Sequence, residues 1–133
     1  MATLLITHPS FVAHDTGPGH PERPDRMRAI DKVLAHESYS ALKRAEAPLR
    51  LDTEEEIRRV HPAEFVGRIK GAAELVKKRG ASIHIDGDTV MSPGSHEAAL
   101  RAVGAGLDAV DEVMTGRVAN AFCQVRPPGH HAE

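Results

Sequence analysis

A short apolar run at residues 118–125 restricts the possible folds of this chain more than any other segment. Glycine precedes the run and two prolines follow it, as is typical of a strand buried inside a parallel sheet. The next turn is stiff at Pro127 and Pro128 and permissive at Gly129, and it leads directly to His130 and His131. Open α/β proteins place their functional groups in such loops, beyond the carboxyl ends of the strands. The segment therefore predicts an α/β fold with two histidines at one edge of a parallel sheet.

Adjacent histidines can share the work of proton transfer. Each ring titrates near neutral pH, and their proximity couples the two protonation steps. One ring can accept and release a proton while its neighbour supplies charge and orientation. The alternative interpretation is a solvated pair in a surface turn. Because the pair follows a stiff turn at the end of a predicted buried strand, we favour a catalytic role for His130 and His131.

Four segments, ordered along the chain, carry recognisable motifs: GPGHPERPDRM at residues 17–27, VHPAEFV at 60–66, DGDT and SPGSHEAA within 86–99, and RPPGHHA at 126–132. Together they resemble the class II-like branch of the histone deacetylase superfamily, which includes bacterial histone-deacetylase-like amidohydrolases and acetylpolyamine amidohydrolases. The resemblance implies an arginase/deacetylase-like three-layer α/β fold, with helices on both faces of a mostly parallel sheet. It also implies that residues 1–133 are the amino-terminal part of one catalytic domain, incomplete at the carboxyl end.

For a complete family domain, the resemblance implies zinc-dependent hydrolysis of an acetylated amine, either acetyl-lysine or an acetylpolyamine. His131 would act as the general base and His130 would give electrostatic support. Asp88 would accept hydrogen bonds from substrate amides at the rim, and Arg26 would lie near the inner end of the channel. The alternatives are a turn or capping role for Asp88 and a solvated cation at a helix start for Arg26.

The resemblance also implies which groups this chain lacks. The family's zinc ligands and its oxyanion-binding tyrosine all follow the paired histidines, so no metal ligand is expected here. The single tyrosine, Tyr39, lies in an early helical region and does not match that position. We therefore expect this chain alone to be inactive.

Composition excludes several other classes of protein. The 17 basic and 19 acidic residues give a net charge of -2, with no basic block suited to phosphate contacts, so nucleic-acid binding is not expected. A lone cysteine, Cys123, allows neither a disulfide framework nor a cysteine zinc site, and we expect a small buried hydrophobe. No signal-peptide pattern and no long apolar run occurs, which predicts a cytoplasmic protein without a membrane partner.

Periodicity and capping signals predict strands at residues 3–7, 47–51, 83–85 and 118–125, and helices from about Pro24, at 53–60, at 62–79 and at 92–115. Thr53 and Glu56 have capping-box spacing, and Gly80 supplies a helix stop. The last helix should bury one apolar side, formed by Leu100, Val103, Leu107, Val110 and Met114. Its alanine- and glycine-rich segment at 102–106 should allow close packing on a neighbour.

Two other functions compete with the deacetylase prediction. A non-catalytic interaction module would use the unpaired sheet edge left after residues 118–125, and would form a homo-oligomer or pair with a complementing carboxy-terminal fragment. A metal-binding protein would use His130, His131 and Glu133. Adjacent histidines do not easily reach one ion in tetrahedral geometry, so we place this possibility third.

Overall fold

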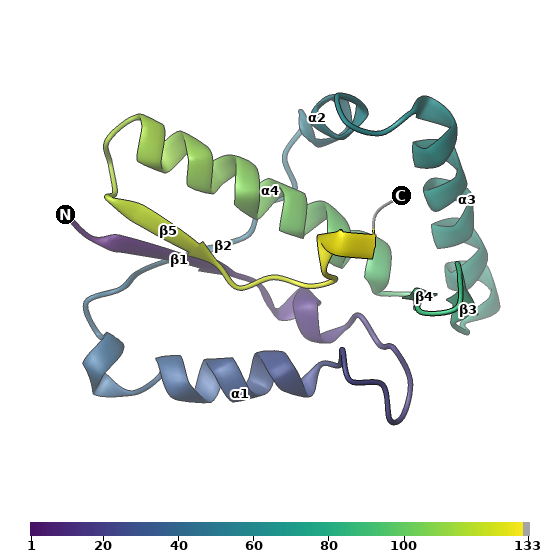
Figure 1. Ribbon diagram of the computed structural model, residues 1–133, viewed down its shortest axis with the longest axis horizontal. Helices are drawn as coiled ribbons and strands as arrows, with labels where there is room; N and C mark the ends of the chain where they lie inside the picture. The colour runs from purple at the N-terminus through teal and green to yellow at the C-terminus, as the bar shows by residue number, and fades with distance from the viewer. Residues whose placement is uncertain (132–133) are drawn as a thin grey trace.

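A small parallel sheet forms the centre of the molecule (Figure 1). The computed structural model describes residues 1–131, and of His131 only the backbone. Within that range the sheet has the strand order β2-β1-β5, where β1 is Thr3–Thr7, β2 is Lys43–Glu46 and β5 is Asn120–Cys123. Leu4 pairs with Lys43 on one side and with Ala121 on the other, and both pairings are parallel. Because β1 is central, its Leu4–Ile6 segment is buried on both faces of the sheet, as its continuous apolar sequence predicts.

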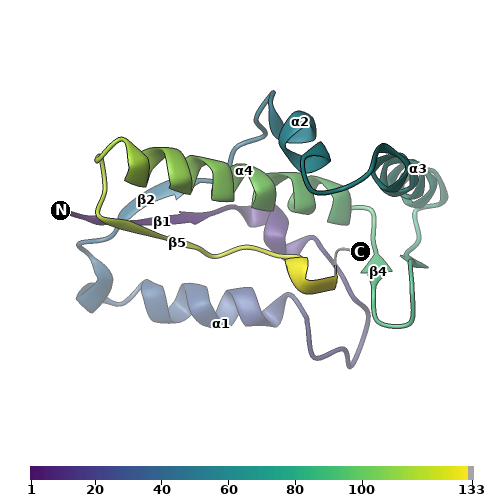
Figure 2. The same cartoon turned by 45° about the horizontal axis from the view of Figure 1, so that its top comes forward.

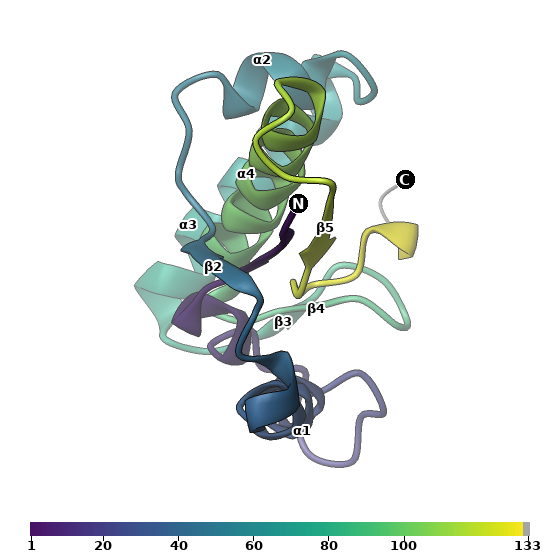
Figure 3. The same cartoon turned by 90° about the vertical axis from the view of Figure 1, so that its left-hand side faces the viewer.

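Helices cover both faces of this sheet. The helix α4 (Ser95–Met114) lies on one face and α1 (Asp25–Leu34) on the other, as Figures 2 and 3 show. The main core joins Leu4 and Ile6 of the sheet to Met27 of α1 and to Ala98 and Ala105 of α4. The predicted α/β class, with a mostly parallel sheet between two helical layers, is confirmed.

The buried side of α4 differs from the predicted one. On the predicted side, Val110 is 60% exposed and Met114 is 79% exposed, while Leu100, Val103 and Leu107 are half-buried but lie outside the core that packs on the sheet. The sheet is instead packed by small side chains at helical spacing, namely Ala98, Ala102, Ala105 and Ala109. Small residues let the helix axis approach the strands closely. Side-chain size therefore determines which side of α4 packs on the sheet, and the prediction from hydrophobicity alone chose the wrong side.

The second strand lies earlier than the predicted strand at 47–51. The residues of β2 are all exposed, and the charges of Lys43, Arg44 and Glu46 conceal the strand from a hydrophobicity pattern. Such charges are typical of edge strands, where they discourage pairing with other chains. Ala47 still donates from its amide to the carbonyl of Thr7 (2.8 Å), but Pro48 cannot extend the ladder.

The predicted strand at 118–125 is present but shorter and less buried. In β5, Asn120 is exposed and Phe122 is 49% exposed, while Cys123 is half-buried and donates from Sγ to the Ala105 carbonyl of α4 (3.6 Å). Gln124 follows on the same face as Phe122 and is buried against α1, since its amide nitrogen bonds Asp31 (2.7 Å). In the described residues β5 pairs only with β1, so its other edge has no strand beside it.

A second, smaller core lies beside the sheet layer. It is formed by α3 (Ala63–Arg79) and a two-stranded antiparallel hairpin, β3 (Ile83–His84) and β4 (Val90–Met91), around Ala73, Val76 and Met91. Gly80 ends α3 in a left-handed conformation (φ 63°), as predicted.

The helix α2 (Thr53–Arg58) precedes α3 and ends two residues before the predicted end at Val60. Asp52 occupies the cap position, so the predicted capping box at Thr53 is wrong, and the buried Thr53 hydroxyl has no hydrogen-bond partner among the described residues. Short 3-10 turns complete the fold at Pro9–Val12, Glu37–Tyr39 and Gly129–His131. None of the helices in residues 1–131 combines the length and apolar character that a membrane crossing requires.

Candidate active site

A groove of about 1330 Å³ opens beyond the carboxyl ends of β1 and β5. Its walls come from the loop that follows β1, the β3–β4 hairpin, the facing sides of α3 and α4, and the turn that follows β5. In Figure 2 that turn, the first loop and the hairpin lie at the same end of the molecule. This is the edge of a parallel sheet at which α/β proteins bind ligands.

Three of the predicted site residues line this groove together. They are Arg26 at the start of α1, Asp88 in the hairpin turn and His130 after the Pro-Pro-Gly turn. Arg26 is half exposed and donates to Glu22 (2.9 Å), and Asp88 is exposed. His130 is also exposed, at the mouth of the groove. The side chain of His131 lies outside the described part of the chain, so its predicted role as the general base stays a prediction.

The hairpin turn that carries Asp88 is held by its neighbour Asp86. The Asp86 carboxylate accepts hydrogen bonds from the amides of Asp88 and Thr89, both at 2.8 Å, and from the Thr89 hydroxyl at 3.0 Å. This is the local pattern by which aspartate shapes turns. Asp86 therefore has the turn-forming role, and the Asp88 carboxylate is presented at the rim.

The strongest polar contact of the site joins Glu22 to Arg126, and sequence reasoning did not find it. Arg126 is fully buried (0% exposed). Its Nε and Nη2 donate to the two carboxylate oxygens of Glu22 at 2.6 and 2.8 Å, and its Nη1 donates to the carbonyls of Phe11 and His14 at 2.7 and 2.8 Å. Burial would raise the pKa of Glu22, but the hydrogen bonds and charge of Arg126 outweigh it and lower that pKa. Both residues lie inside motifs quoted above, but nothing in the sequence indicated that they pair.

His14 is a second residue of the site that the sequence did not indicate. It is 4% exposed, and its Nδ1 lies 2.6 Å from the hydroxyl of Ser95, the first residue of α4. Burial, and then the charge of Arg126, lower the pKa of His14, so the ring is neutral near pH 7. The 3.6 Å contact between its Nε2 and Glu22 is therefore a contact of a neutral ring with a carboxylate, not an ion pair.

Histidines dominate the titratable lining of the groove: His14, His20, His84, His96 and His130. Burial, and then the charges of Lys77 and Lys70, lower the pKa of His96. His8 and His36, outside the groove, cap short turns through Nδ1.

The described residues do not fit a resident zinc ion. Among them no group of three or more His, Cys, Asp or Glu side chains is placed to hold a metal. The alternative site from His130, His131 and Glu133 lies partly outside the described residues.

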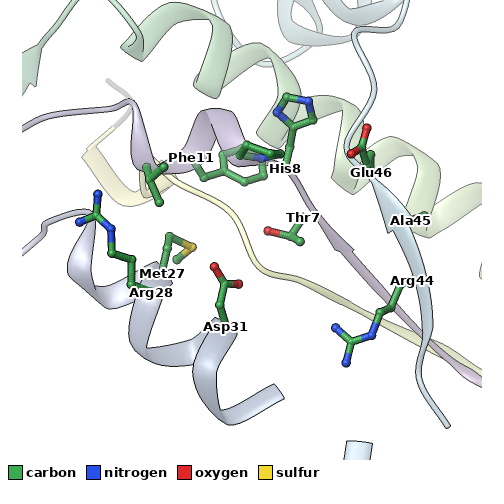
Figure 4. Close-up of a pocket in the computed structure, with 11 residues that line it drawn as sticks. Thr7, His8, Phe11, Met27, Arg28, Asp31, Arg44, Ala45 and Glu46 are labelled. Carbon is green, nitrogen blue, oxygen red and sulfur yellow. The ribbon is translucent and has the colours of Figure 1, made fainter. Parts of the chain in front are cut away.

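A second cavity, of about 530 Å³, lies between α1 and the ends of β1 and β2 (Figure 4). Its floor is apolar, with Phe11 and Met27, and charged side chains surround it. Two of these charges have partners within the protein: Asp31 accepts from Gln124 (2.7 Å) and Arg44 donates to the Leu34 carbonyl (2.6 Å). The groove that holds His130 is the better candidate for chemistry.

Comparisons with known proteins agree with this geometry. The sequence model of the histone deacetylase domain matches residues 20–133. Histone deacetylase-like amidohydrolase of Pseudomonas aeruginosa is 35% identical over 129 residues, which cover 96% of this chain and 32% of that protein. Polyamine deacetylase HDAC10 of Homo sapiens is 33% identical over 139 residues, which cover 100% of this chain and 20% of that protein.

A solved structure shares the fold. The crystal structure of the HDA15 HD domain matches with a TM-score of 0.84 and 30% identity, over 98% of this chain and 37% of that one. The chain thus spans well under half the length of each of these proteins.

Proposed function

The chain belongs to the histone deacetylase domain family, and from this membership we propose that it forms one side of the active site of a zinc-dependent amidohydrolase that removes acetyl groups from amines. One observation carries the proposal. The first loop, the hairpin and the turn with the paired histidines, which hold three of the motifs, surround a single groove at the carboxyl edge of the sheet. The substrate class is acetyl-lysine or acetylpolyamine.

Each predicted residue receives a role in this proposal. His131 takes a proton from the attacking water as the water oxygen bonds the acetyl carbon. It returns that proton to the amine nitrogen as the carbon–nitrogen bond breaks, which releases acetate and the free amine. His130 stabilises the charge that develops during this transfer. Asp88 accepts hydrogen bonds from substrate amides at the rim, and Arg26 faces the acetate at the inner end.

Zinc would polarise the acetyl carbonyl and acidify the water in a complete site. The described residues do not supply its ligands, so the proposal assigns them to another part of a family domain. We expect the purified 133-residue chain, with zinc added, to hydrolyse neither acetyl-lysine nor an acetylpolyamine. Turnover of either substrate by this chain would contradict that expectation.

A chimera tests the active-site assignment directly. Residues 1–133 would replace the matching segment of the Pseudomonas aeruginosa amidohydrolase, and hydrolysis of both substrate classes would be measured. We expect an active chimera, and His131→Ala in it should lower kcat by about 10²- to 10⁴-fold, the usual contribution of a general base. His36→Ala, at an exposed turn cap, is the control and should leave kcat unchanged. A folded chimera in which both variants behave alike would refute the role of His131.

One observation favours a second function, that of an interaction module. The outer edge of β5 has no strand beside it in residues 1–131, and Phe122 is 49% exposed there. Such an edge would pair with a second copy or with a complementing fragment. Sedimentation of the purified chain tests this: a dimer weakened by Phe122→Glu supports it, and a monomer at high concentration contradicts it. A cytoplasmic location, without nucleic-acid or membrane partners, stays a prediction that cell fractionation can check.

A further inference from the structure

We infer that Glu22 and Arg126 are positioning residues, which lock the first groove loop to the exit of β5 and so fix the turn that presents His130. The inference rests on the proposed function, since it concerns the same groove. It adds two residues that contact no substrate in that proposal and that act through the backbone.

The contacts of Arg126 reach both ends of the first loop. Phe11 and His14 accept its Nη1 hydrogens at the beginning of that loop, and Glu22 accepts from Nε and Nη2 near its end. The guanidinium group holds its N–H donors in one rigid plane. All four hydrogen bonds can therefore form in only one arrangement of the loop and the arginine. His130 follows Arg126 by four residues, across the stiff prolines. A displacement of the loop would therefore displace the turn that carries His130.

The same set of contacts reaches the opposite wall of the groove. His14 lies 3.6 Å from Glu22 and 2.6 Å from the Ser95 hydroxyl. Ser95 in turn accepts a hydrogen bond from the amide of Ser92 (2.8 Å), directly after β4. Polar groups thus connect three segments that line the groove, through two contacts between residues distant in sequence: Arg126 with Glu22, and His14 with Ser95.

Stability alone does not account for this arrangement. Burying an ion pair removes two charges from water, and apolar replacements of similar volume are often as stable or more stable. The four hydrogen bonds of Arg126 offset this desolvation cost only when their geometry is good. The arrangement therefore favours one conformation of the first loop and the β5 exit over others. A positioning role explains why a fully buried arginine lies at this point in the chain.

Backbone ¹⁵N relaxation of the 133-residue chain tests the inference without any substrate. In the unmodified protein, Gly129 and His130 should have order parameters near those of rigid backbone, about 0.85. Glu22→Gln removes the negative charge and replaces one acceptor oxygen that faces Arg126 with an NH₂ donor. Arg126→Lys keeps the positive charge but loses the paired N–H donors that bind both oxygens of Glu22. In both variants the order parameters at 129 and 130 should fall below about 0.6.

Arg50→Gln provides the matched control. Arg50 also bonds several carboxylates, Asp52, Asp108 and Asp111, but it does not line the groove. This variant should leave residues 129 and 130 rigid. The inference is overturned if a folded Glu22→Gln protein keeps them rigid, or if the control loosens them equally. Failure of both groove variants to fold would also overturn it, in favour of a role in stability alone. The chimera assay decides the proposed function separately.

Discussion

Replacing Gly104 with alanine should destabilise the protein, although alanine is the better helix former. Gly104 lies in α4 at the point where the chain after β2 crosses the helix. A Cβ built there would press into the carbonyl oxygen of Pro48, well inside van der Waals contact, with the carbonyl carbon only 3.2 Å away. Because these are backbone atoms, no side-chain rotation can relieve the contact.

The expected magnitude follows from two opposing effects. Overpacking costs about 1–3 kcal/mol, and the upper end applies where the obstacle is backbone. Helix propensity favours alanine over glycine by about 1 kcal/mol. Gly104→Ala should therefore lose about 2 kcal/mol of unfolding free energy, which lowers Tm by roughly 4–8 °C for a domain of this size.

Gly106→Ala is the matched control in the same helix. No atom lies within 4 Å of a Cβ at Gly106, so only the helix propensity changes and the variant should gain up to about 1 kcal/mol. Thermal and urea unfolding followed by circular dichroism would measure both. Equal stability of the two variants would refute the close approach of α4 to Pro48, and with it the small-residue packing of this helix.

Three further predictions concern the groove and its supports. Acidification should lower the unfolding free energy in two steps, because these groups bind protons less readily in the folded protein than in the unfolded chain. The first step lies below about pH 6.5 and comes from His14 and His96, and the second lies below about pH 4.5 and comes from Glu22. A urea titration that shows no loss of stability between pH 7 and 5 would contradict the first step. Arg126→Met should cost about 3–5 kcal/mol in urea unfolding, because the Glu22 carboxylate loses its bidentate buried partner and keeps only the exposed Arg26; an unchanged midpoint would argue against the buried pair. Gly80→Ala should cost about 1–2 kcal/mol from left-handed backbone strain alone, since nothing obstructs a Cβ there; a stabilised variant would disprove the φ of 63°.

Local signals were sufficient where neighbours along the chain decide the structure. The apolar residues Leu4–Ile6 predicted a strand, and Gly80 predicted the end of α3. Arg26, Asp88 and His130, which the family resemblance singled out, line one groove. Each of these predictions depends on a pattern within a few residues, or on the family resemblance.

Tertiary contacts decided what the sequence did not predict. Nothing local relates Glu22 to Arg126, which are 104 residues apart. The burial of His14 depends on Ser95, which is 81 residues away. Hydrophobicity pointed to the wrong side of α4 because close packing on the sheet selects small residues, and it missed β2 because an edge strand with charged side chains has no apolar pattern.

The separate small core of α3 and the hairpin has a consequence for the width of the groove. Phe65, Ile69 and the hairpin form one wall, and that wall is held mainly by Ala73, Val76 and Met91 rather than by the sheet. Segments with few buried apolar contacts open at a lower free energy than the whole domain. Amide hydrogen exchange in α3 should therefore be faster than in β1. Local opening of α3 and the hairpin would widen the groove while the sheet stays folded.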